Sequence, residues 1–244
     1  MINALHREIL KLIQKHSGKP TQHTFLDSYF GNDHKRYPIS APTLRVIAKD
    51  WMRAHRELTP DEFSAMLTSL IKGESSTEKV MAGILMGYSP KEQRKFNPEL
   101  FDLWLDHLVG WAEVDAVCTG DFSITQLPSE WTKWKKLVIK LSKDPNINKR
   151  RASLVLFCSP LSRVKDDRMA EVAFKITDRL KSEKEVLITK AISWLLRSMI
   201  KHYRESVSAY LIENREKLPK IAVRETTVKL KTGKKNRHKN KRKV

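Results

Sequence analysis

Apolar residues recur along most of the chain at intervals of three and four positions, the spacing of helices that bury one face. At the N-terminus, Leu5, Ile9, Leu12 and Ile13 form such a stripe. The same period runs through the ranges 44–52, 78–87, 100–109, 131–141, 150–157, 170–180, 186–200 and 207–218. No segment shows the clear apolar–polar alternation of a strand, so the pattern predicts an all-α protein.

Helix-start signals separate these stripes. Thr59, Pro60 and Glu62 have the order of a capping box, with Thr at the N-cap and Pro at the first helical position. The stretches 89–93 and 97–100 follow the same logic. Short loops and a rhythm of roughly 30 to 40 residues per helix pair favour an α-solenoid. A compact, irregular helical bundle is the alternative.

The charge of the chain is strongly positive, with 47 Lys and Arg against 28 Asp and Glu. Residues 229–244 contain nine of these cations and no acid, so subtracting nine from the net +19 still leaves +10 on the rest. We therefore expect one helical domain over residues 1–230 and a basic, disordered tail over 231–244. A basic body favours a polyanion, most simply nucleic acid.

Other classes of function find little support in the sequence. No apolar run approaches the ~20 residues of a membrane-spanning helix, and the N-terminus lacks a signal-peptide pattern. The two cysteines and eight histidines show no metal-ligand spacing, and no nucleotide-binding or hydrolase motif occurs. We expect no metal, no cofactor and no membrane partner.

One carboxylate interrupts an apolar face. In a helix over 111–118, Asp115 lies on the same broad side as Trp111, Val114 and Cys118. An isolated aspartate of this kind more often caps a helix or pairs with a buried arginine than performs chemistry. Asp115 is nevertheless the candidate catalytic carboxylate.

Two further patterns suggest phosphate contacts. Arg150 and Arg151 open an apolar helix, where cations oppose the helix dipole unless they and the free N–H groups face an anion. Lys190, Trp194 and Arg197 follow one another along a later helix, which could be a core stripe or an aromatic floor with basic walls.

Taken in order, these segments resemble the AlkD-type family of DNA alkylation repair glycosylases, which are built of HEAT-like helical repeats. The resemblance covers roughly residues 1–230 and is carried by six stretches in the family's order, namely 29–51, 78–87, 111–115, 149–157, 184–197 and 218–226. It implies a solenoid of antiparallel helix pairs with a concave, positively charged surface.

The resemblance also assigns roles to residues. Asp115 matches the family's catalytic acidic position, while Trp111 and Trp194 match two aromatics that pack against the sugar and backbone of the damaged nucleotide. Arg151 and Tyr29 match DNA-contacting positions; Arg150, Lys190 and Arg197 are added as DNA-binding candidates from the basic pattern. The chain departs from the family at two positions, because Gly110 stands where relatives often have a second Trp and Ser193 where they often have Gly.

The implied activity is hydrolysis of the N-glycosidic bond of N3- or N7-alkylated purines in duplex DNA, from the backbone side and without base flipping. Such a purine is cationic and leaves as a neutral base, so one carboxylate that stabilises the oxocarbenium-like sugar is sufficient in kind. We expect a monomer, either cytoplasmic and nucleoid-associated in a bacterium or nuclear in a eukaryote.

Two alternatives remain open at this point. The first is a non-catalytic DNA- or RNA-binding helical repeat protein, in which Asp115 is structural. The second is a protein-binding HEAT scaffold, whose concave face need not be basic.

Overall fold

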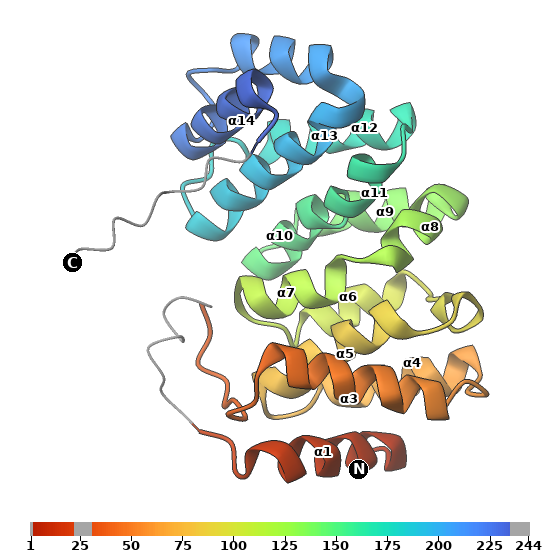
Figure 1. The fold of residues 1–244 in the computed structure, drawn as a ribbon. Coiled ribbons are helices and arrows are strands. Elements are labelled where there is room, and N and C mark those ends of the chain that lie inside the picture. Colours follow the sequence, from red (N-terminus) through yellow and green to blue (C-terminus); the bar gives the residue numbers. More distant parts are fainter. Residues whose placement is uncertain (1, 22–30, 235–244) are drawn as a thin grey trace.

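The helices of this protein stack in sequence order from one end of the molecule to the other. The computed structural model describes residues 2–21 and 31–234, with α1 at one end of the stack and α14 at the other (Figure 1). Within these residues the chain is helical apart from loops and two isolated β-bridges. The prediction of an all-α solenoid is therefore confirmed.

The first half of the described chain consists of α1 (Ala4–Ser17), α3 (Ala41–Ala54), α4 (Pro60–Ile71), α5 (Ser76–Tyr88), the 3-10 helix η1 (Lys91–Arg94), α6 (Glu99–Leu105) and α7 (Gly110–Cys118). The second half consists of α8 (Asp121–Ser129), α9 (Trp131–Leu141), α10 (Ile147–Val155), α11 (Cys158–Arg163), α12 (Asp167–Leu180), α13 (Val186–Glu213) and α14 (Lys220–Thr232). The predicted boundary after residue 230 falls in the last turn of α14, and residues 235–244 of the predicted tail lie outside the described part.

Capping chemistry explains several helix starts. The capping box at Thr59 forms as the sequence predicts, with Glu62 accepting from the Thr59 N–H at 2.9 Å. Ser75 and Glu78 form a second one at the start of α5. The stretch 89–93 instead gives the short η1, because the Ser89 hydroxyl donates to the carbonyl of Met86 and caps no new helix.

Two rows of helices build the stack. In one row α3, α5, α7, α10 and α13 pack each against the next, and α14 packs on α13. In the second row α6 packs on α9 and α9 on α12, while α4 packs against α5. Residues far apart in sequence are thereby brought side by side along the first row, which carries most of the candidate site.

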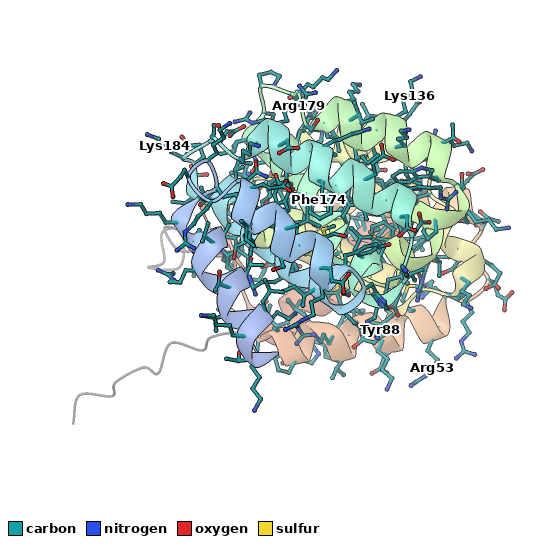
Figure 2. The ribbon with its side chains drawn as sticks, turned by 90° about the horizontal axis from the view of Figure 1, so that it is seen from above. Arg53, Tyr88, Lys136, Phe174, Arg179 and Lys184 are labelled. Atoms are coloured by element: carbon teal, nitrogen blue, oxygen red, sulfur yellow. The ribbon has the colours of Figure 1, made fainter. Side chains whose placement is uncertain are left out.

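The core between the rows is apolar and rich in aromatic side chains. Trp104, Trp134 and Phe101 are fully buried, and the ring of Phe101 contacts both tryptophan rings. Figure 2 shows the opposite behaviour at the periphery, where charged side chains such as Arg53 and Lys136 project outward. Burial of each large apolar side chain contributes about 1.5 to 3 kcal/mol, so this cluster is a main source of stability.

The crossing of α5 over α7 depends on a glycine. A Cβ at Gly83 would collide with the carbonyl group of Ala116, a backbone atom that no rotamer change can move away. A Cβ at Gly87, one turn later in the same helix, would meet nothing within 4 Å. The close approach at Gly83 sets how near the helix bearing Asp115 lies to its neighbour.

We expect Gly83→Ala to lower the free energy of unfolding by about 1 to 3 kcal/mol, because α7 must move away from α5. Gly87→Ala is the matched control and should raise stability by about 0.5 to 1 kcal/mol through helix propensity. Urea denaturation followed by circular dichroism measures both. Equal effects of the two substitutions would contradict the close crossing.

Candidate functional site

Asp115 and Arg151 form the centre of the candidate site. The Nε of Arg151 donates to Oδ1 of Asp115 at 2.9 Å, and Nη2 donates to Oδ2 at 2.7 Å. The pair joins α7 to α10, and only 16% of the aspartate side chain and 5% of the arginine side chain are exposed. This is the bidentate geometry that gives charge-assisted hydrogen bonds their strength.

The same guanidinium also reaches the next helix. Its Nη1 donates to the carbonyl oxygen of Leu187 at 2.5 Å, at the start of α13. Arg151 therefore holds α7, α10 and α13 together at one point. The predicted apolar face of α7 is buried, because Val114, Val117 and Cys118 are all inaccessible to solvent.

Burial dominates the electrostatics of Asp115. It raises the pKa of the carboxyl group, and the hydrogen bonds and positive charge of Arg151 oppose that rise. Buried Cys158 senses the same groups: burial and Asp115 raise the pKa of its thiol, while Arg151 and Arg197 lower it. The carboxylate and both arginines thus act on a single low-dielectric region.

Arg150 has its own internal partners. Its guanidinium binds Glu183 through Nε at 2.8 Å and Nη2 at 3.1 Å, and it donates to the carbonyls of Asp144 and Pro145. Both arginines at the start of α10 are therefore paired with carboxylates, which offsets their unfavourable place near the helix dipole. Their contact with a phosphate stays a prediction.

The residues expected on α13 differ in environment. Lys190 is exposed, and Trp194 is half-buried against the core. Arg197 is buried: its Nε donates to the Ser193 carbonyl at 3.0 Å, and Nη2 lies 3.2 Å from Glu225 of α14. The stripe thus has one basic side chain toward solvent and one toward α14.

Ser193, which stands where members of the resembled family often have Gly, faces α14. Its hydroxyl donates to Oε2 of Glu225 at 2.8 Å, and the residue is buried. This hydroxyl therefore helps to fasten α14 to α13. Trp111 lies half-buried in the first turn of α7, one helical turn before Asp115. Tyr29 lies outside the described residues.

Sequence reasoning missed a second carboxylate in α7. Glu113 is fully buried, accepts from the Val109 N–H at 2.8 Å and accepts from Nδ1 of His34 at 2.9 Å. Two residues from Asp115, it reads in sequence as a solvated first-turn acid. No local signal indicates its burial, because His34 comes from another part of the chain.

Two cavities lie away from this cluster. One of about 820 Å³ lies beside α1 and α4, and one of about 980 Å³ lies beside α6 and α9; neither is lined by Asp115. Among the described residues no group of three or more His, Cys, Asp or Glu could hold a metal ion. None of the described helices has the length and apolarity to cross a bilayer.

Fold and site together define a helical solenoid with a largely buried Asp–Arg pair on its first row of helices. The pair joins α7, α10 and α13, and Trp111 lies on α7 and Trp194 on α13. The model of the family described as DNA alkylation repair enzyme matches residues 11–230. The chain therefore belongs to this family, and that membership supports a role in alkylation repair.

A solved structure supports the fold. The chain is similar to a predicted DNA alkylation repair enzyme from Enterococcus faecalis, with 19% identity and a TM-score of 0.68. The match covers 83% of this chain and 91% of the other. At this identity the likeness concerns the fold alone. No curated protein matches the sequence.

We expect Arg151→Met to lower the free energy of unfolding at pH 8 by about 3 to 5 kcal/mol, since Asp115 would keep a buried charge without a partner. Burial already raises the folded-state pKa of Asp115, and without Arg151 this pKa would rise further, so protonation at low pH favours the folded state of the variant. The loss should therefore grow as pH rises through that pKa. Chemical denaturation at pH 5 and pH 8 measures this change.

Arg53→Met is the matched control, because Arg53 pairs with Asp50 on an exposed surface. It should change stability by no more than about 0.5 kcal/mol. A loss of stability in Arg151→Met that is the same at both pH values would contradict the burial of Asp115 as its cause.

Proposed function

We propose that this protein is a DNA glycosylase that hydrolyses the N-glycosidic bond of N3- and N7-alkylated purines in duplex DNA. The observation that carries the proposal is the bidentate Asp115–Arg151 pair on α7 and α10, in a chain of the DNA alkylation repair enzyme family. In this pair a carboxylate is hydrogen-bonded directly to a guanidinium, the group best suited to bind a phosphate.

The chemistry follows from the lesion. An alkylated purine carries a positive charge and departs as a neutral base, leaving an oxocarbenium-like deoxyribose. A carboxylate in a low-dielectric setting stabilises that cation more strongly than one in water. Asp115 supplies this charge and orients the attacking water, and Arg151 opposes the rise in the pKa of its carboxyl group that burial causes.

The tryptophans and the remaining cations are assigned to the DNA. Trp111 and Trp194 offer aromatic faces to the cationic sugar, worth about 0.5 to 2 kcal/mol for each contact. Arg151, Arg150, Lys190, Arg197 and Tyr29 are the proposed contacts to the DNA backbone, on a concave, HEAT-like and positively charged surface. Approach from the backbone side needs no pocket for a flipped base.

A second candidate function is a non-catalytic DNA- or RNA-binding helical repeat protein. One observation favours it: both oxygens of Asp115 are engaged by Arg151, as in a purely structural ion pair. This alternative shares the fold and the charge, so only the chemistry of Asp115 separates the two functions.

We expect Asp115→Asn to slow base release by about 10²- to 10³-fold, because the amide keeps the shape and loses the charge. Its dissociation constant for the same duplex should stay close to that of the wild type. Chromatographic detection of free 7-methylguanine and fluorescence anisotropy give the two quantities. Asp50→Asn, on the exposed face of α3, is the control and should match the wild type.

The outcomes separate the two functions. A wild type that binds the duplex and releases no base would establish the non-catalytic alternative. An Asp115→Asn variant that keeps the wild-type rate would remove the carboxylate from the mechanism.

We expect excision to be restricted to cationic lesions, because no contact to the base edge helps the bond to break. The rate with 7-methylguanine should far exceed the rates with hypoxanthine and uracil, which leave without a positive charge. Comparable rates for the three lesions in matched duplexes would contradict the backbone-side mechanism.

The logarithm of the association constant for duplex DNA should fall linearly with the logarithm of the salt concentration, with a slope of about −0.9 for each phosphate neutralised.

A further inference from the structure

No side chain at the N-cap position caps the start of α7, the helix that bears Asp115. Its N-cap residue is Val109, which has no side chain that can cap, and its first residue is Gly110 with φ of +75°. In the αL region a glycine is tolerated without strain. The first turn nevertheless carries Trp111, whose position must be set by something outside the local sequence.

Three polar contacts from elsewhere hold this first turn. Asn32 donates from Nδ2 to the Val109 carbonyl at 3.1 Å, and Asn148 of α10 accepts from the Gly110 N–H at 3.0 Å. His34 donates to the buried carboxylate of Glu113, whose other oxygen accepts the Val109 N–H at 2.8 Å. Two of the three contacts come from residues 31–37.

The segment 31–37 is itself fixed on the neighbouring helix. The carbonyl of Lys35 accepts from the Ser76 N–H at 2.8 Å, and the Tyr37 N–H donates to the Thr77 hydroxyl at 3.0 Å. Gly31 packs on the Gly110 backbone, since a Cβ there would lie 3.7 Å from the Gly110 Cα. The segment therefore bridges the N-termini of α5 and α7.

The bridge formed by residues 31–37 supplies a hydrogen-bond donor to the buried carboxylate of Glu113. Glu113 is fully buried, and a buried carboxylate is tolerated only with hydrogen-bond donors. The charged group from α5 that acts on Glu113, the amine of Lys79, is occupied by the carbonyls of Ile71 and Gly73. Within residues 2–21 and 31–234, His34 is thus the side chain that donates to Glu113.

We propose that His34 and Glu113 are positioning residues, which fix the first turn of α7 so that Trp111 and Asp115 face the same nucleotide. The role in catalysis rests on the proposed glycosylase function, whereas the placement of Trp111 does not. Asn32 and Val109 are 77 positions apart in sequence and His34 and Glu113 are 79 apart, yet these residues belong to one functional unit.

The test compares His34→Ala with His34→Asn, which places an amide donor near the position of the ring Nδ1. Single-turnover base release should fall by roughly 10- to 100-fold in His34→Ala with the dissociation constant unchanged, because misplacement affects the reacting geometry and not the affinity. His34→Asn should recover most of the rate. His16→Ala, on the exposed face of α1, should behave as the wild type.

A double-mutant cycle identifies the partner. Glu113→Gln should lower the rate by a similar factor. The double variant His34→Ala/Glu113→Gln should release the base no more slowly than the slower of the two single variants. Independent, multiplying effects would overturn the assignment of His34 and Glu113 as a pair. A parallel loss of DNA affinity in His34→Ala would also overturn it.

A readout without DNA separates this inference from the proposed function. In protein labelled with 5-fluorotryptophan, the Trp111 resonance, assigned with Trp111→Phe, should shift in His34→Ala and return in His34→Asn. An unmoved resonance would overturn the positioning role. If the wild type releases no base, the glycosylase proposal fails, and the fluorine spectrum alone then decides whether His34 places Trp111.

Discussion

The ion pair between Asp115 and Arg151 is the interaction on which the arrangement of the candidate site depends. It is nearly excluded from water, and the arginine uses its remaining nitrogen on the Leu187 carbonyl, so one side chain links three consecutive helices of the first row. A buried ion pair often contributes little net stability. Its value lies in geometry, because breaking it leaves a charge without a partner and misplaces the carboxylate relative to α13, the helix that bears Trp194.

A second constraint acts on the same helix from the other side. The start of α7 has no capping side chain of its own, and the 31–37 segment, Glu113 and Asn148 satisfy its backbone groups. The close crossing at Gly83 then holds α7 against α5. Asp115 therefore lies in a helix fixed on several sides, as expected of a group that must meet a substrate without reorganisation.

Membership of the DNA alkylation repair enzyme family and the geometry of the pair support one economical reaction. A cationic purine needs no acid to leave, so a single carboxylate can serve where most glycoside hydrolases use two. The arginine has two uses in this proposal, as it opposes the rise in the pKa of Asp115 that burial causes and remains close to the DNA backbone. The buried Arg197–Glu225–Ser193 cluster fastens α14 beside Trp194 and gives the departure at Ser193 a structural role.

The sequence by itself determined the helices, because their apolar periods and caps are local; the capping box at Thr59 forms as its residues predict. It also placed Trp111 and Asp115 on one face, since residues four apart share a side of any helix. It could not determine that Arg150 turns to Glu183 while Arg151 turns to Asp115, because neighbouring residues on a helix point in different directions. Nor could it indicate the burial of Glu113 beneath His34. Only the tertiary structure decided these partners, since burial and pairing depend on which distant helices the solenoid brings together.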